Sequence, residues 1–279
     1  MRLSESRIAK IAPKVAQNLL SKWRALTYTR EVPTVSFKHS QFDGKDLDSW
    51  IRQGIIGYQQ WYQSVDFGNG VVADVTVPPD WRPRPDLNPS SGLDRWNYIV
   101  SRNLPDLTGS RVLDLGCNVG LYSIELARMG AREVVGVDRD TSIRQRTGRL
   151  PRVDLISQAE FVHEALQYRE NRNFPVSYQA IDFKNLSELT RLGWFDLILA
   201  LNVVYHELDR APSLVETLGS MTDVLVLQSS VTHPSPIREW ASPSKSVEML
   251  TAAGFDYVTV DSPRGYLQPV IRGIRKKTQ

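Results

Sequence analysis

The chain is poor in the residues that form disulfides and membrane spans. It has one cysteine, Cys117, among 279 residues, which excludes an internal disulfide and a thiolate zinc cluster and is typical of a reducing cytoplasm. No run of about 18 residues is uncharged and apolar, so we expect no transmembrane helix and no membrane partner. The amino terminus, residues 1–7, has no apolar segment or cleavage site, so we expect no secretion signal. The sequence therefore predicts a cytoplasmic protein.

Histidine and net charge are also scarce. The four histidines have no metal-ligand spacing, so no metal site is predicted, and a formal net charge of +3 neither requires nor forbids a nucleic-acid partner. By contrast, 41% of the residues are hydrophobic and seven are tryptophan. This composition predicts a well-filled globular core, either one large domain or a catalytic domain with an added module.

A glycine-containing loop follows an apolar run at residues 111–115. Gly116 and Gly120 allow a ligand to approach the main chain, and Asn118 between them tolerates a left-handed conformation. The next apolar run ends at Asp138, 24 positions after Asp114. A strand-end acid at about 20 residues' distance is typical of nucleotide-binding βαβ units, where it binds ribose hydroxyls.

The loop lacks the G-x-G-x-x-G pattern that brings a pyrophosphate to a helix amino terminus. Asp114 precedes the loop, where a carboxylate repels phosphate but suits a cationic or amino group. An amino-acid-bearing nucleoside is therefore the favoured ligand.

The stretch from Asp114 to Gly120 resembles the first motif of class I S-adenosylmethionine-dependent methyltransferases, and Gly136 to Asp138 resembles the second. The resemblance implies S-adenosylmethionine as the cofactor and assigns roles to further residues. Asp182 is similar to the acceptor of the adenine amino group, Phe183 to the ring that stacks on adenine, and Asn202 to the residue beside the methionine part. The implied cofactor-binding set is Asp114, Gly116, Asn118, Gly120, Asp138, Arg139, Asp182, Phe183 and Asn202.

Strands and helices alternate after residue 110. We expect strands at 111–115, 133–138, 176–181, 195–201 and 223–229, then an antiparallel pair at 255–261 and 268–274 joined by a turn at 262–265. Helices are expected at 119–129, 157–172, 185–192, 210–220 and 244–253. The predicted fold is α/β: a Rossmann-like seven-stranded sheet of five parallel strands plus a terminal antiparallel hairpin, matching the methyltransferase resemblance.

Residues 1–110 do not follow this pattern and are predicted to be an N-terminal extension that covers the acceptor pocket, with residues 111–279 as the catalytic domain. Helical spacing predicts an amphipathic helix over 8–26, bent at Pro13, and a hairpin is expected around Gly68–Gly70, followed by a proline-rich stretch at 78–89. The aromatic residues proposed to contact substrate are Tyr58, Trp61, Tyr62 and Trp96. The alternative is that they only pack the extension onto the catalytic domain.

Tyr205 and His206 follow the fourth expected strand. In methyltransferases this exit faces the transferred methyl, so the resemblance places both residues near the acceptor. Methyl transfer from a sulfonium is an in-line displacement in which positioning contributes most. A base is needed only when the acceptor loses a proton, and His206 is the candidate. The alternative is a structural histidine at the sheet edge.

The acceptor itself is less well specified. Arginines in the insertion at 139–152 suit either a solvated loop or an anionic-substrate contact. Residues 55–275 loosely resemble the transferases that carboxymethylate or methylate tRNA wobble uridine, but no lysine near Trp81 to Trp96 matches the contact their carboxylated cofactor requires. We predict a methyltransferase acting on a small molecule, such as an aromatic or heterocyclic natural product. A tRNA-modifying transferase and a catalytically silent cofactor-binding protein are the alternatives, and the oligomeric state, a homodimer included, stays open.

Overall fold

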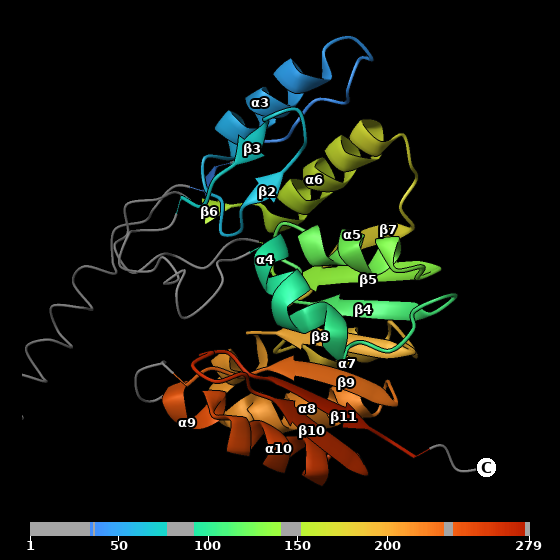
Figure 1. Ribbon diagram of the computed structural model, residues 1–279, viewed down its shortest axis with the longest axis vertical. Helices are drawn as coiled ribbons and strands as arrows, with labels where there is room; N and C mark the ends of the chain where they lie inside the picture. Colours follow the sequence, from blue (N-terminus) through green and yellow to red (C-terminus); the bar gives the residue numbers. More distant parts are fainter. Residues whose placement is uncertain (1–33, 36, 77–91, 141–151, 232–236, 277–279) are drawn as a thin grey trace, which may run out of the picture.

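A seven-stranded mixed sheet runs through the middle of the protein (Figure 1). The computed structural model describes residues 34–35, 37–76, 92–140, 152–231 and 237–276. Strand order is β10-β11-β9-β8-β4-β5-β7, with β7, β5, β4, β8 and β9 parallel and β11 antiparallel to both β9 and β10. The strands are β4 (Arg111–Leu115), β5 (Glu133–Asp138), β7 (Val176–Ala180), β8 (Leu197–Leu201), β9 (Val224–Gln228), β10 (Tyr257–Asp261) and β11 (Val270–Ile274). The predicted sheet architecture is confirmed.

Both faces of the central strands of the sheet are buried. Successive side chains of a strand point to opposite faces, and in β8 Leu197, Leu199 and Leu201 join one hydrophobic cluster while Ile198 and Ala200 join the other. Helices α5 and α6 pack in the first cluster, and α7, α8 and α10 in the second. The helices are α5 (Leu121–Arg128), α6 (Leu155–Glu170), α7 (Leu186–Thr190), α8 (Ala211–Gly219), α9 (Ile237–Ala241) and α10 (Pro243–Ala252). Because β8 is covered on both sides, chemistry is confined to the ends of the central strands.

The amino-terminal part of the described chain, residues 37–76, forms a cover beside α6 (Figure 1). It contains α3 (Leu47–Tyr58) and a short antiparallel pair of β2 (Val65–Asp66) and β3 (Val72–Ala73). The expected hairpin around Gly68–Gly70 is therefore confirmed. Helix α3 was not expected from the sequence; it begins after Asp46, whose carboxylate accepts the Ser49 N–H at 3.0 Å.

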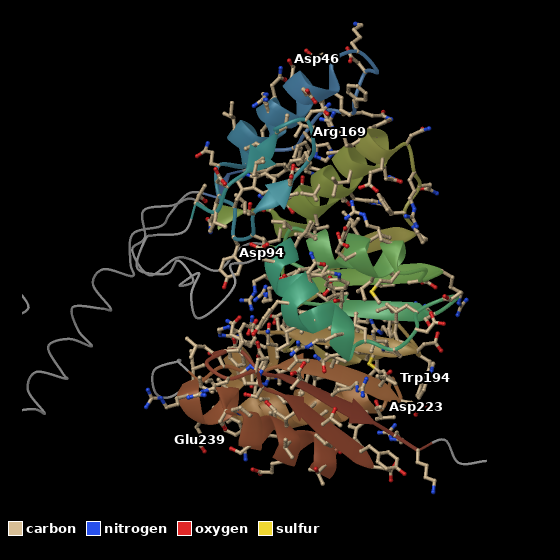
Figure 2. The ribbon with its side chains drawn as sticks, viewed as in Figure 1. Asp46, Asp94, Arg169, Trp194, Asp223 and Glu239 are labelled. Atoms are coloured by element: carbon tan, nitrogen blue, oxygen red, sulfur yellow. The ribbon has the colours of Figure 1, made fainter. Side chains whose placement is uncertain are left out.

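Two further contacts hold the cover in place. Arg169 of α6 pairs with Asp48 of α3, and Figure 2 shows Arg169 and Asp46 in this part of the molecule. Strand β1 (Thr34–Val35) pairs in parallel with β6 (Arg152–Val153), just before α6. The expected helix over 8–26, the proline-rich stretch at 78–89 and positions 141–151 of the arginine insertion lie outside the described residues.

The cover and the sheet share one hydrophobic core. Between them the chain forms α4 (Leu93–Arg95), the π-helix η2 (Trp96–Val100) and the 3-10 helix η3 (Ser101–Asn103). Trp96 packs in the same cluster as Trp50 of α3 and Leu199 of β8. The core therefore continues across residue 110, and the division into an extension and a catalytic domain at that point stays a prediction.

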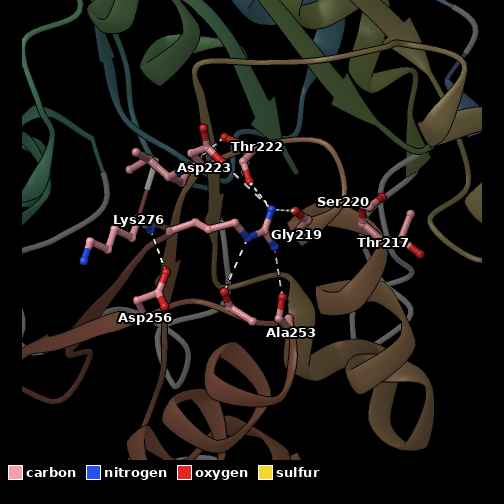
Figure 3. Close-up of polar contacts among 11 residues, drawn as sticks. Thr217, Gly219, Ser220, Thr222, Asp223, Ala253, Asp256 and Lys276 are labelled. Atoms are coloured by element: carbon pink, nitrogen blue, oxygen red, sulfur yellow. Dashed lines mark hydrogen bonds and ion pairs between the residues drawn. The ribbon is translucent and has the colours of Figure 1, made fainter. Parts of the chain in front are cut away.

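Arg275, directly after β11, ties this antiparallel strand to two helices. Its guanidinium donates to the carbonyls of Gly219 at 2.8 Å and Ala253 at 3.0 Å, at the carboxyl ends of α8 and α10 (Figure 3). A cation is favourable at a helix carboxyl end because the last carbonyls are unpaired and carry partial negative charge. This residue, Arg275, anchors the terminal hairpin, whose connecting loop reaches the opposite end of the sheet.

Candidate active site

Asp138 organises the end of β4 and β5. Its buried carboxylate accepts the Asn118 N–H at 2.9 Å and the Arg139 N–H at 2.8 Å. Asn118 has a φ of 51°, so the glycine loop turns back onto Asp138. The Arg139 guanidinium lies 4.0 Å from the same carboxylate. Burial raises the pKa of Asp138, and the two N–H donors and Arg139 act against that rise. The structure thus brings three of the expected cofactor residues together.

Asp114 is a second buried acid beside the loop. Its carboxylate accepts the Ser123 hydroxyl at 2.6 Å. Burial raises the pKa of Asp114 to about 7, and the nearby charge of Asp138 adds to the rise while the Ser123 hydrogen bond opposes it. A cationic ligand group beside these two buried acids would favour their ionised forms and offset the effect of burial.

The loop glycines are required by space as well as by backbone conformation. Gly116 has a φ of 81°, and a Cβ added there would lie 2.1 Å from Cγ2 of Val203. Gly120 has a φ of 76°, and its added Cβ would lie 2.4 Å from the Tyr178 hydroxyl. The loop therefore packs closely against the exit of β8 on one side and against β7 on the other.

We expect Gly116→Ala to weaken cofactor binding and stability together, because it adds both a clash and the cost of a left-handed alanine, about 1–2 kcal/mol for the latter. Gly109→Ala is the matched control, since Gly109 has a φ of 72° but nothing lies within 4 Å of its added Cβ. Thermal unfolding and cofactor titration of both variants check this. Equal losses in the two variants would show that packing against Val203 is unimportant.

The exit of β8 forms the third wall of the site. Asn202 has a φ of 57°, and its side-chain amide donates to Gln228 at the end of β9, at 3.0 Å. Tyr205, in the 3-10 helix η4 (Val204–Arg210), donates its hydroxyl to Asn202 Oδ1 at 3.0 Å. The His206 ring is exposed and lies against the Tyr205 ring, with centroids 4.6 Å apart. Burial raises the pKa of Tyr205 well above its usual range, so its phenol is neutral at physiological pH.

Asp182 and Phe183 follow β7, at the same end of the sheet. Asp182 is exposed, and its carboxylate accepts the Lys184 N–H at 3.0 Å. Phe183 is buried in the cluster that contains α7 and α8. Their roles beside adenine stay predictions.

The four aromatic residues expected to contact substrate lie in different surroundings. Tyr58 and Trp61 are each only 1% exposed and pack around Phe161 of α6, with the Tyr58 hydroxyl donating to the Ser157 carbonyl at 2.7 Å. Trp96 is buried against Tyr122. Tyr62 is 48% exposed and influences the titration of Tyr205. We therefore keep the substrate-contact proposal for Tyr62, because its side chain is exposed and those of the other three residues are buried.

Arg95 belongs to the site but was missed by the sequence reasoning. It is buried, donates to the Tyr122 hydroxyl at 2.8 Å, and lies 3.4 Å from Oε1 of Gln268. Burial acts to lower the pKa of Arg95, but Tyr122, with smaller contributions from Tyr62 and Tyr266, outweighs it, so the pKa is raised. Among the described residues no carboxylate forms an ion pair with Arg95. A buried cation without an acidic partner is costly unless a ligand supplies the anion. No clear sequence signal was available, because the helical stretch 93–100 also contains Asp94 and Asn97 and so resembles an ordinary amphipathic segment.

Strand-end acids, a tight glycine loop and a buried cation at one edge of a mixed seven-stranded sheet define a Rossmann-like protein that binds an amino-acid-bearing nucleoside. A family model described as a methyltransferase domain matches residues 91–260, and the chain belongs to this family. The prediction of a class I S-adenosylmethionine-dependent methyltransferase is confirmed, and with it the cofactor of the class.

Known relatives differ in their substrates. The chain is 32% identical over 127 residues to a ubiquinone biosynthesis O-methyltransferase of Nitrosococcus oceani, covering 46% of this chain and 43% of the relative. It is 23% identical over 207 residues to a tRNA U34 carboxymethyltransferase of Desulfotalea psychrophila, covering 74% and 53%. The chain thus spans about half the length, or less, of these curated relatives.

The fold is shared with the N-terminal domain of EvdMO1, solved with S-adenosylhomocysteine bound. The TM-score is 0.57 at 18% identity, covering 83% of this chain and 98% of that one. In the described part of the chain, no helix is long and apolar enough to cross a membrane.

Proposed function

We propose that this protein transfers a methyl group from S-adenosylmethionine to a small molecule, with an aromatic or heterocyclic acceptor favoured. The observation that carries the proposal is the charge pattern of the site. Two buried acids, Asp114 and Asp138, lie at the glycine loop, and the buried Arg95, which forms no ion pair with a carboxylate among the described residues, bonds to Tyr122 just after the loop. These charges match an ammonium, a ribose diol and a carboxylate, all of which the cofactor carries.

Each of these residues fits a particular part of the cofactor. Asp138 binds the ribose hydroxyls, and Asp182 with Phe183 borders the adenine. Asp114 and the loop favour the ammonium group, and Arg95 takes the carboxylate as a charge-assisted partner. Gly116 and Gly120 hold the loop in this shape, because a Cβ at either position would meet protein atoms. The bound cofactor supplies an electrophilic methyl group on a sulfonium.

The protein's own contribution is chiefly orientation. Well-oriented reacting groups gain up to about 7–11 kcal/mol over free encounter. Asn202 and Tyr205 hold the exit of β8 in one arrangement, and Tyr62 offers an exposed ring near them. When the acceptor must lose a proton, His206 receives it, since the neutral Tyr205 phenol with its raised pKa is a poor base.

The test is release of S-adenosylhomocysteine on incubation with S-adenosylmethionine and a panel of phenols, hydroxylated heterocycles, amines and tRNA. We expect turnover with a small molecule and a loss in His206→Ala of about 10²–10⁴-fold in kcat, with cofactor affinity unchanged. Turnover that persists in His206→Ala would remove the base role. Absence of turnover across the panel, with cofactor binding intact, would favour a silent binding protein.

A tRNA acceptor is the second candidate, because the tRNA U34 carboxymethyltransferase of Desulfotalea psychrophila matches 74% of this chain, against 46% for the ubiquinone biosynthesis O-methyltransferase. A tRNA enzyme must bind tRNA with an affinity that falls steeply as salt rises, since phosphate contacts release counterions. In the same panel, turnover confined to tRNA would replace the small-molecule proposal.

A further inference from the structure

Two glycines, one in the glycine loop and one in β5, lie against the same aromatic ring. A Cβ added at Gly120 would lie 2.4 Å from the hydroxyl oxygen of Tyr178, a residue of β7. A Cβ added at Gly136 would lie 2.6 Å from Cδ1 of the same tyrosine, which pairs with Gly136 in the parallel ladder of β5 and β7. The Tyr178 ring therefore fills the space that side chains at both glycines would occupy.

Gly136 provides space rather than backbone freedom. Its φ is not positive, unlike that of Gly120, so the strand conformation itself would accept an alanine. The atoms nearest to an added Cβ belong to the Tyr178 ring. An aromatic ring that covers a glycine on the neighbouring strand is a recognised way of stabilising a sheet at that point.

The Tyr178 hydroxyl makes a directed contact with the loop. It donates to the Gly120 carbonyl at 3.3 Å. The same carbonyl accepts the Ile124 N–H at 3.2 Å in the first turn of α5, and the Gly120 N–H donates to the Cys117 carbonyl at 2.9 Å, which closes the turn that carries Asn118. Tyr178 thus contacts the point at which the glycine loop becomes a helix.

Neighbouring side chains limit the movement of the ring. The His163 ring of α6 lies against the Tyr178 ring, with centroids 6.0 Å apart and an angle of 74° between the planes. The Cβ added at Gly136 would also lie 3.0 Å from Oγ of Ser123, so the tyrosine ring borders the hydrogen bond between Ser123 and Asp114. Contacts with α6, β5 and the loop together favour one position of the ring.

We propose that Tyr178 is a positioning residue for cofactor binding, which holds the glycine loop in the arrangement that brings the Asn118 N–H to Asp138. The loop then has its binding shape before the cofactor arrives, and binding does not have to order it. Tyr178 acts through the loop, so no contact between its side chain and the ligand is required. This inference rests on the proposed function, in which the glycine loop and Asp138 bind the cofactor.

Titration with S-adenosylhomocysteine tests the inference. Tyr178→Phe keeps the ring and removes the hydroxyl, and we expect its affinity to be about three- to tenfold weaker, as for loss of one hydrogen bond. Thr222→Val is the matched control, because Thr222 is fully buried before β9, at the opposite end of the sheet, and its hydroxyl donates to the Val224 carbonyl at 3.1 Å. This control should lose stability in a similar way and keep the wild-type affinity.

Hydrogen exchange separates an effect on the loop from a loss of overall stability. In Tyr178→Phe without ligand, a peptide covering residues 116–121 should exchange at least about threefold faster than in the wild type, because local opening exposes amides without unfolding the sheet. A peptide covering β8 reports on the sheet and should change only as far as the overall stability does. In Thr222→Val the loop peptide should exchange as in the wild type.

The inference is overturned when Tyr178→Phe binds S-adenosylhomocysteine as tightly as the wild type, or when Thr222→Val loses as much affinity. It is also overturned when Tyr178→Phe binds more weakly but its loop exchanges at the wild-type rate, since the residue then does not act through the loop. Tyr178→Met, which also lacks the hydroxyl, serves in the same measurements when Tyr178→Phe does not fold. Failure of the proposed function is a different result: the wild-type protein does not bind the cofactor, or binds it without slowing exchange at residues 116–121.

Discussion

Replacing Asp138 by alanine should abolish measurable binding of S-adenosylmethionine, with an increase in dissociation constant of at least about 100-fold. Charge-assisted hydrogen bonds contribute about 1.5–3 kcal/mol each, and a carboxylate that receives both ribose hydroxyls makes two. The same change leaves the Asn118 and Arg139 N–H groups without their acceptor, so the loop loses the contact that turns it toward β5. Isothermal titration with S-adenosylhomocysteine and S-adenosylmethionine measures the effect.

Asp196→Ala is the matched control for that experiment. The Asp196 carboxylate accepts the Arg111 N–H at 2.7 Å at the amino end of β4, on the side of the sheet where Figure 2 shows Trp194 and Asp223. Like Asp138→Ala, the Asp196→Ala variant loses a carboxylate that accepts a main-chain N–H. Its free energy of unfolding should therefore fall in a similar way, while its cofactor affinity is retained. Normal cofactor binding by Asp138→Ala would show that the assignment of the ribose site is wrong.

Replacing Asp114 by asparagine should stabilise the cofactor-free protein at pH 8. The pKa of Asp114 is raised from 3.8 to about 7 by burial. Between these values the unfolded chain has released the proton that the folded protein keeps, so the free energy of unfolding decreases as pH rises from about 4 to 7. The loss reaches up to about 4 kcal/mol above pH 7. An asparagine does not titrate, so urea denaturation should show a gain at pH 8 that shrinks toward pH 4.

The same substitution should weaken cofactor binding and remove part of the pH dependence of the cofactor affinity. A cationic ligand prefers ionised Asp114, so wild-type affinity should increase as pH rises toward 7 and then level off. In Asp114→Asn this rise should be smaller, because only groups common to both proteins, such as Asp138, still titrate. Parallel pH profiles for the two proteins would exclude Asp114 as the responsible group. Ser123 can still donate to the asparagine oxygen, so the hydrogen bond of the buried site is kept.

The central fold was predictable because its elements carry strong local signals. β4 and β5 have the bounds expected from their apolar runs, and α5 to α8 and α10 differ from expectation by one to two residues at their ends. Helix α3 escaped prediction because its apolar positions, such as Trp50, Ile51 and Tyr58, are spread among polar residues that face solvent. They become a core only through Phe161 of α6, more than 100 positions away in the chain.

The candidate site also contains residues that the sequence predicted and residues that it did not. Asp138, Asn118 and Gly116 were found because a loop and the strand beside it form one local unit, and spacing along the chain reports on it. Arg95 was not predicted, because nothing near it in sequence marks it as a candidate. It is notable only when Tyr122 and Gln268 are seen around it.

By itself, the sequence determined the class of protein. Its few glycines and strand-end acids specify a nucleoside-binding sheet, because that loop geometry needs particular residue types at particular positions. Only the tertiary structure decided which aromatic residues keep an exposed surface, which buried arginine forms no ion pair within the described part of the chain, and which group accepts the Tyr205 hydroxyl. Those properties depend on burial and hydrogen-bond partners brought from distant segments, and no local pattern encodes a partner that lies a hundred residues away.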